Sequence, residues 1–285
     1  MGLLGAALAA SPGIAHAQAL DLFYGRAVMS AADERCGLFT PEISGALAAA
    51  AVQARSAALR SGASVETIDV VARRARDRAA ALDCASPALT GDAARVRNAF
   101  AGFARVSELT YPGEVAGWRA ERSGPGAIRW RLAQDSSFGA DRMTFGLAGR
   151  APPGVLVAVA EFADGARPYG ARLLMRDPAR ADQPYLDRFA GAGVLPLSRR
   201  LPPREALRAY SAEARSPAGL DLLPKAARSG WAFRFPAGAT AALVGLDPRE
   251  AIAVEFLFEN DVVRRAYVEV GDFAAGEAFI KLAQR

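Results

Sequence analysis

Residues 36–84 read CGLFTPEISGALAAAAVQARSAALRSGASVETIDVVARRARDRAAALDC and lie between the only two cysteines of the chain. The stretch contains two helix patterns joined by a short break. The first is predicted over residues 40–60, because a Thr-Pro-Glu start suits an N-cap, a first helical position and an acidic first turn. The second is predicted over residues 64–83, with a serine N-cap after a Ser-Gly break. We expect the two helices to pack antiparallel, as helices joined by a short loop do.

The antiparallel arrangement predicts a structural disulfide between Cys36 and Cys84. Cys36 precedes the first helix and Cys84 follows the second, so both lie at the same end of the helical hairpin. The bond closes a loop of about 48 residues, which the chain-entropy model values at about 4 kcal/mol. Two free thiols and a redox pair are the alternatives. Redox pairs usually have C-x-x-C spacing, which this pair lacks.

Residues 1–17 have the pattern of a secretory signal peptide. A short apolar run precedes a Ser-Pro-Gly sequence at 11–13, which predicts a helix break, and Ala15-His16-Ala17 then has small residues at the two positions that signal peptidase recognises. The apolar run covers about ten residues, whereas a membrane-spanning helix needs about 20. The pattern therefore predicts cleavage and export to the periplasm or the medium, with no transmembrane segment.

Two features leave alternatives open at this end of the chain. The first charged residue is Asp21, so the leader has no basic residue near its start. Ala17-Gln18-Ala19 is a second possible cleavage frame. A helix at the N-terminus that stays in the folded protein is the alternative to a signal peptide.

The composition indicates a globular chain, with 52% hydrophobic and 23% charged residues. The net charge is +5, and only two of the 35 basic residues are lysines, Lys225 and Lys281. Arginine binds carboxylates and phosphates in a bidentate manner, but a GC-rich genome produces the same bias. For an exported chain we expect no nucleic-acid partner. Another envelope protein or an acidic envelope polymer is the expected partner.

The only histidine, His16, lies in the predicted leader. Its removal would exclude Ser-His-Asp and Cys-His catalysis, the common catalytic zinc sites and a histidine pH switch. Calcium-loop spacing and a glycine-rich phosphate loop before a helix are both missing from the sequence. We therefore expect no metal and no other cofactor.

The fold class predicted outward from the cysteines is α+β. A disulfide-stapled four-helix domain is expected over residues 18–112, with a first helix at 20–35 and a fourth that opens at Thr90 and ends at Tyr111-Pro112-Gly113. Residues 113–285 are expected to form an antiparallel β-sheet or sandwich with a few helices, because alternating apolar and polar residues replace the helical period.

Strands and connections of the second domain follow from period-two alternation and turn residues. Strands are predicted at 128–132, 143–147, 155–162, 169–175 and 231–235. In the first of these, Trp130 and Leu132 are expected on one face. The strand at 169–175 is expected to return beside 155–162 after the Asp164-Gly165 turn. Residues 177–203 are expected to connect strands, with a helical turn at 185–189, and a short helix is expected at 239–244. Residues 204–215 fit strand and helix equally.

The clearest hairpin covers residues 252–270. A two-residue loop would place apolar residues opposite charged ones, whereas a three-residue loop at 259–261 places Ile252 beside Val268. The same register sets Glu255 opposite Arg265 as a cross-strand charge pair on the outer face. We prefer the three-residue loop, with Asn260 or Asp261 in a left-handed conformation. A terminal helix is expected after Gly271-Asp272.

Candidate binding residues are three arginines of the β-rich domain, Arg129, Arg131 and Arg142. They would bind an acidic ligand if their guanidinium groups converge. Three tryptophans, Trp118, Trp130 and Trp231, suit a sugar-binding face as well as a core. A basic run on the third helix suits a solvated face or a contact surface; its members are Arg73, Arg74, Arg76 and Arg78.

Paired carboxylates are the remaining route to catalysis. Five acidic residues lie in or beside predicted strands: Glu161, Glu255, Glu259, Glu269 and Asp272. The function expected from the sequence is a non-enzymatic binding or scaffolding protein of the cell envelope. A hydrolase or lyase that acts on polysaccharide is the alternative.

Overall fold

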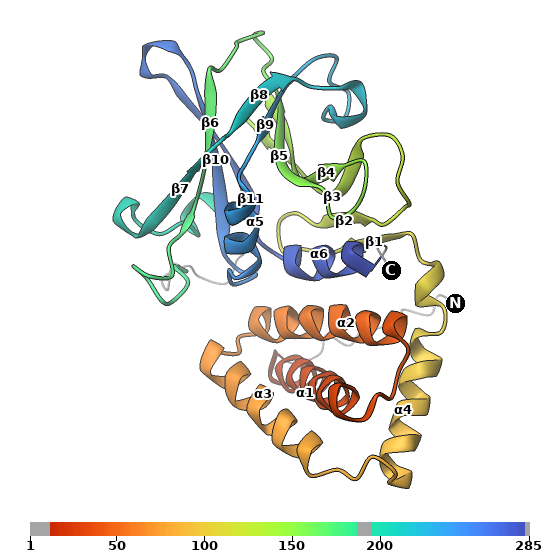
Figure 1. The fold of residues 1–285 in the computed structure, drawn as a ribbon. Helices are drawn as coiled ribbons and strands as arrows, with labels where there is room; N and C mark the ends of the chain where they lie inside the picture. Colours follow the sequence, from red (N-terminus) through yellow and green to blue (C-terminus); the bar gives the residue numbers. More distant parts are fainter. Residues whose placement is uncertain (1–11, 187–194, 283–285) are drawn as a thin grey trace, which may run out of the picture. The chain divides into compact units, whose positions relative to one another are not determined.

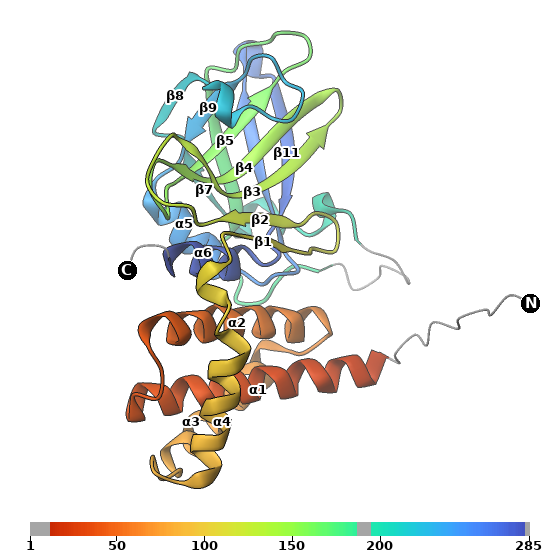
Figure 2. The ribbon, with the colours of Figure 1, turned by 90° about the vertical axis from the view of Figure 1, so that its right-hand side faces the viewer.

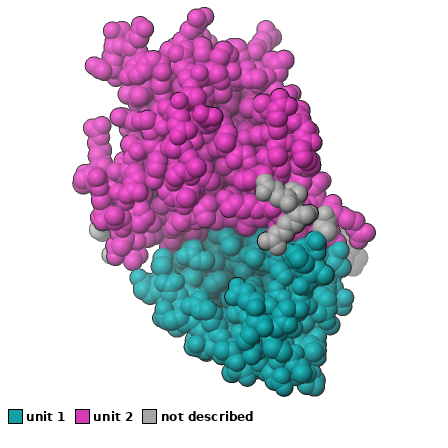
Figure 3. Space-filling view, in the orientation of Figure 1, with its two compact units in different colours: residues 1–101 teal, residues 102–285 magenta. Residues whose placement is uncertain are grey.

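Two units make up the chain in the computed structural model, which describes residues 12–186 and 195–282. The helical unit extends to Ala101 and the β unit begins at Gly102 (Figure 3). The expected boundary at residue 112 lies too far along the chain, because Glu108–Tyr111 already forms a strand of the β unit. The α+β fold class, with helices first and antiparallel strands after them, is confirmed.

The helical unit contains four helices in its described part (Figure 1): α1 Pro12–Cys36, α2 Pro41–Arg60, α3 Val65–Ala80 and α4 Pro87–Phe100. Helix α1 packs along α2 and α3, whereas α4 contacts mainly α2. Figure 2 shows α4 running across α1 and α2 rather than alongside them. Two apolar cores form between the helices, one around Leu59 and Ile68 and one around Leu47 and Leu89.

Helix α1 begins at Pro12 and includes Gly13, while the run that the expected break at residues 11–13 would end lies outside the described residues. Proline suits a first helical position because the N–H that it lacks would be unpaired there. The helix includes the Ala-x-Ala frame, and Nδ1 of His16 lies 3.1 Å from the carbonyl oxygen of Ser61. The apolar run of the predicted leader lies outside the described residues. Signal cleavage stays a prediction.

Side-chain caps mark the starts of α3 and α4, whereas Thr40 before α2 makes no capping hydrogen bond through its side chain. Helix α2 begins and ends as predicted, and the hydroxyl of Ser64 accepts the backbone N–H of Thr67 at the start of α3. Helix α4 begins at Pro87 rather than Thr90, because Ser86 caps it by accepting the N–H of Leu89. It ends at Phe100 and not at Tyr111, since the chain turns into the β unit there.

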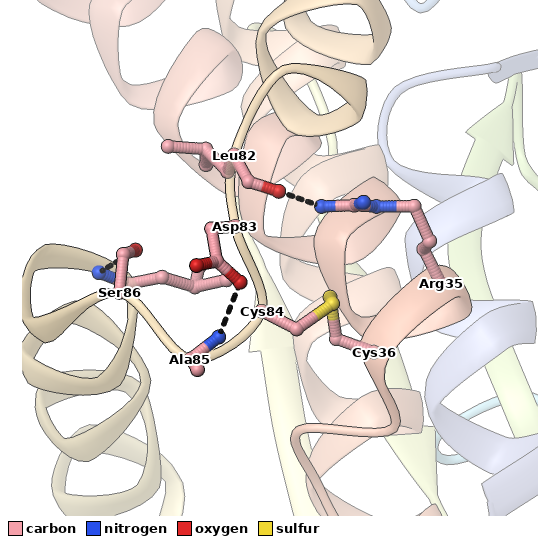
Figure 4. The surroundings of a disulfide bond; sticks show 8 residues. Arg35, Cys36, Leu82, Asp83, Cys84, Ala85 and Ser86 are labelled. Carbon is pink, nitrogen blue, oxygen red and sulfur yellow. Dashed lines mark hydrogen bonds between the residues drawn. A yellow bond between two sulfur atoms is a disulfide. The ribbon is translucent and has the colours of Figure 1, made fainter.

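Cys36 and Cys84 form the predicted disulfide, with their Cα atoms 5.6 Å apart (Figure 4). Figure 4 also shows the guanidinium group of Arg35 donating to the carbonyl oxygen of Leu82 beside the bond. The C-terminus of α1 is thus joined to the α3–α4 corner by a covalent bond and a hydrogen bond.

The β unit, over residues 102–186 and 195–282, contains two antiparallel sheets. The first has seven strands in the order β1 Glu108–Tyr111, β2 Trp118–Glu121, β3 Arg129–Phe138, β4 Asp141–Gly149, β5 Val155–Glu161, β9 Trp231–Arg234 and β8 Ala214–Pro217. The second has four strands in the order β11 Val263–Glu269, β10 Ala251–Leu257, β6 Gly170–Arg176 and β7 Leu207–Ser211. Two α-helices accompany them, α5 Ala237–Val244 and α6 Phe273–Lys281. The remaining helical turns are η1 Phe103–Arg105, η2 Leu197–Arg199, η3 Arg204–Ala206, η4 Leu220–Leu222 and η5 Glu259–Asp261.

Strand β6 does not return beside β5, contrary to expectation. The chain turns at Gly165, which has a φ of 71°, and β6 joins the second sheet between β10 and β7. Residues 204–215, where strand and helix fitted equally, form η3, β7 and the start of β8. Of the helical turn expected at 185–189, residues 187–189 lie outside the described part.

Aromatic side chains fill the space between the two sheets. The ring of Phe256 on β10 has its centroid 5.6 Å from that of Phe138, 5.2 Å from Phe162 and 5.4 Å from Phe233. Each contact joins the second sheet to the first sheet or to the residue after β5. At the end of the chain, Phe273 of α6 packs against the first sheet.

The side chain of Gln134 on β3 links the first sheet to the edge of the second. Its Oε1 accepts the N–H of Glu269 at 2.8 Å, and its Nε2 donates to the carbonyl oxygen of the same residue at 3.2 Å. A buried amide thus provides the donor and acceptor that a neighbouring strand would supply.

The register predicted for the last hairpin is confirmed: Ile252 pairs with Val268, and Glu255 pairs with Arg265. Both Asn260 and its neighbour Asp261 have a φ of 58°, where the prediction required only one left-handed residue. Glu255 faces away from the first sheet and pairs with Arg265, as expected, but it is buried. Its side chain is 2% exposed, because β6 pairs on the other side of β10 and places a second arginine over the carboxylate.

A β-bulge at residue 131 corrects the expected pattern of β3. Trp130 pairs with Ala148 while Leu132 pairs with Leu147, so Arg131 is the extra residue. Trp130 and Leu132 therefore lie on opposite faces of the sheet and not on one. Trp130 packs with the apolar cluster of the outer face.

Candidate functional site

The three predicted binding arginines do not converge. Arg129 lies beside Gly149 at one end of the β3–β4 ladder, whereas Arg142 lies at the other end, opposite Ser137. Arg129 donates to a carboxylate oxygen of Glu121 at 2.9 Å. Their separation along the ladder does not permit a common ligand carboxylate.

Arg131 has a structural role. It is fully buried, and its guanidinium group donates to the carbonyl oxygens of Ser123 and Arg150, both at 2.7 Å. It also donates to the carbonyl oxygens of Gly124 and Gly149. These bonds hold the loop after β2 and the loop after β4 against the bulge.

Two of the candidate carboxylates, Glu269 and Glu255, also have structural roles. The buried carboxylate of Glu269 accepts the backbone N–H groups of Glu114, Val115 and Ala116 at 2.7–2.9 Å. That of Glu255 accepts hydrogen bonds from two arginines. Paired-carboxylate catalysis stays a prediction from the sequence.

Arg172 and Arg265 set the ionisation of Glu255. Burial disfavours the charged form of Glu255, but the hydrogen bonds from Arg265 and Arg172 hold its pKa below the usual range. The carboxylate is therefore charged at neutral pH and lacks the raised pKa that a general acid requires.

A cluster of buried ion pairs, which the sequence did not indicate, lies where β6 ends and β10 begins. The guanidinium group of Arg176 binds both carboxylate oxygens of Glu250, at 2.7 and 2.8 Å, and both side chains are at least 95% buried. Arg249 binds both carboxylate oxygens of Asp247 in the same way. Bidentate pairing of this kind satisfies the buried charges and fixes the loop before β10.

The helical unit contains an apolar groove, here called the helical groove. Its cavity volume is about 580 Å³, and it lies between residues 21–29 of α1, residues 88–100 of α4 and the end of α3. Met29, Leu47 and Leu89 are buried at the groove. The groove forms because α4 crosses α1 instead of packing along it, which leaves apolar side chains on both helices without a facing helix.

Charged residues lie among the apolar side chains of the helical groove. Arg95 pairs with Asp92 on α4. Arg26 donates to the carbonyl oxygen of Ala50 at 2.6 Å, and burial lowers its pKa. Arg78, from the basic run on α3, is exposed at the groove.

Sequence reasoning missed the helical groove. Its apolar residues recur at the same helical spacing as core residues, and spacing does not tell which face a neighbouring helix covers. All of its lining residues, from Asp21 on, follow the predicted cleavage site. The groove would therefore remain after removal of the leader.

No protein-family model, curated protein or solved structure matches this chain. None of the helices in the described ranges has the length and apolarity of a membrane span. Among the same residues, no three His, Cys, Asp or Glu side chains are grouped as a metal site requires.

Proposed function

We propose that the protein is an exported binding protein of the cell envelope, and that its helical groove holds the apolar chain of an anionic amphiphile. The observation that carries this proposal is the groove itself. Its volume of about 580 Å³ lies within the range of small-molecule sites, and apolar side chains form most of its surface.

The shape and charge of the helical groove favour a chain with one charged end. Helix α4 forms one wall over residues 88–100, a length of about 18 Å at the usual helical rise. Three arginines and two aspartates line the groove, and one aspartate is already paired with an arginine. An anionic head group therefore complements the charge that remains, with Arg78 as its exposed partner.

The disulfide supports an oxidising location. Structural disulfides persist in the periplasm and outside the cell and are rare in the cytosol. The bond joins α1 to the corner before α4, so it holds together two helices that line the helical groove.

Dodecanoate, a single-chain carboxylate, is a direct probe for the oxidised protein. We expect saturable binding by isothermal titration calorimetry, with one site per chain and a heat-capacity decrease from apolar burial. Ala99→Phe should weaken binding at least tenfold, because the added ring occupies the groove.

Asn98→Phe is the matched control, since Asn98 is exposed on the same helix but does not line the helical groove. It should bind dodecanoate as the unmodified protein does. Failure of the unmodified protein to bind, or equal binding by the two variants, would show the proposal to be wrong.

A further inference from the structure

A second concave site lies on the outer face of the first sheet of the β unit, here called the sheet depression. It is lined by Arg119, Trp130, Asp135, Thr144, Leu223 and Lys225 and has a cavity volume of about 490 Å³. All six belong to the β unit and none lines the helical groove. An inference from this site is therefore independent of the proposed function.

The strands under the sheet depression carry small residues on their outer face. In the strand register Arg119 lies opposite Ala133, which lies opposite Gly146, so these residues share a face. Only glycine fits at 146, where φ is 152° and a Cβ would lie 1.9 Å from the carbonyl oxygen of Leu132. Beyond Arg119, the row that crosses β3 and β4 therefore carries only the small residues Ala133 and Gly146.

The bulge in β3 brings an aromatic ring to this face. Without the extra residue Arg131, Trp130 would face the same way as Leu132, toward the interior. Its indole Nε1 donates to the carbonyl oxygen of Leu222 at 3.2 Å, which fixes the ring beside the sheet depression. Trp130 is only partly buried and lines the sheet depression, so a ligand there can contact it.

Two cations flank the sheet depression. Arg119 comes from β2, whereas Lys225 comes from the loop after η4. Leu222, the last residue of η4, and Leu223 pack against Val157 and Val159 of β5. Arg142 donates to the carbonyl oxygen of Lys225 at 3.3 Å and so anchors the loop to β4. Of the three predicted binding arginines, Arg142 thus contributes here as a positioning residue.

A fixed acceptor completes the sheet depression. One carboxylate oxygen of Asp135 accepts from Arg119 at 2.8 Å, and the other accepts from the hydroxyl of Thr144, also at 2.8 Å. The carboxylate remains 47% exposed and the arginine 56% exposed, so both can also contact a ligand.

We propose that the sheet depression binds a uronate unit of an acidic polysaccharide. The sugar carboxylate would lie between Arg119 and Lys225, the sugar ring would stack on Trp130, and a ring hydroxyl would donate to Asp135. Two cations, one acceptor and one aromatic face are the groups that a sugar acid needs, and the open site leaves room for the polymer to continue.

Affinity electrophoresis and calorimetry with polygalacturonate test this proposal. Lys225→Gln and Arg119→Gln should each weaken binding about tenfold or more, the loss expected for one charge-assisted contact. Trp130→Phe keeps an apolar ring in place and should abolish the change in tryptophan fluorescence on binding.

Lys281→Gln is the matched control, because the other lysine of the chain pairs with Glu277 on α6, away from the sheet depression. It should bind as the unmodified protein does. Equal loss in both lysine variants, or no binding of polygalacturonate at all, would overturn the proposal. Polyphosphate is the test for charge alone: weaker binding supports recognition of the sugar, whereas equal binding that leaves tryptophan fluorescence unchanged contradicts it.

Discussion

The two units of this chain reach stability by different means. Many fully buried residues of the helical unit are alanines, such as Ala32, Ala46 and Ala58, which bury little apolar area each. The β unit instead buries large aromatic rings and bidentate arginine–carboxylate pairs. The Cys36–Cys84 disulfide supplements the alanine-rich core of the helical unit. Arginine–carboxylate pairs hold loops of the β unit. The apolar content of a unit therefore does not by itself set the stability of its core, because the size of the buried side chains also matters.

The largest effect is expected from Glu250→Ala. The variant leaves Arg176 charged and unpaired in the β unit, which should lower the free energy of unfolding by up to about 5 kcal/mol. Urea titration followed by tryptophan fluorescence measures this, because all three tryptophans lie in the β unit. Arg176→Met combined with Glu250→Leu should recover most of the loss. A double variant as unstable as the single one would contradict the account of paired charges.

Cys36→Ser combined with Cys84→Ser should cost about 4 kcal/mol, the loop-closure value for this separation. The loss should appear in helix unfolding by far-ultraviolet circular dichroism, while tryptophan fluorescence of the β unit changes little. Reduced unmodified protein should match the double variant. Equal destabilisation of both units would contradict the view that the disulfide stabilises the helical unit in particular.

Gln134→Leu should destabilise the β unit by about 2 kcal/mol, because the backbone N–H and carbonyl of Glu269 lose their buried partner. Hydrogen exchange should show faster exchange at the Glu269 amide. Unchanged protection there would mean that the amide does not join the sheets in solution.

The smallest effect is a pH dependence of the β unit. Folding lowers the pKa of Glu255, so the ionised carboxylate stabilises the fold above the titration range of an unfolded glutamate. That contribution is lost as the pH falls through the folded-state pKa. The difference in unfolding free energy between the unmodified protein and Glu255→Gln should therefore be largest near neutral pH and shrink in acid. A difference that is constant with pH would contradict the lowered pKa.

The sequence predicted local features well where one short-range signal acts alone. Alternation and a polar loop were enough for the register that sets Ile252 beside Val268. Helix caps and cysteine spacing were enough for the bond between Cys36 and Cys84. Both features depend on residues close in the chain, or on two helices joined by a short loop.

Prediction failed where a distant strand or a single extra residue decided the outcome. The burial of Glu255, which the sequence did not indicate, depends on β6, which pairs with β10 from far along the chain. The direction of Trp130 depends on the bulge at Arg131, which interrupts an alternation that looks regular in the sequence. The site residues followed the same rule: Arg129 and Arg131 bind groups close to them in the chain. Arg119 and Lys225 lie far apart in the sequence and line one depression only after folding.

The amino-acid sequence by itself determined the α+β class, the Ser64 cap of α3, the disulfide and the register of the last hairpin, because periodicity and capping act within a few turns or strands. Only the tertiary structure decided which helix faces stay uncovered, which carboxylates form ion pairs with arginines and which side chains line the helical groove and the sheet depression. Those outcomes depend on contacts between segments far apart in the chain, and local residue patterns carry no record of them.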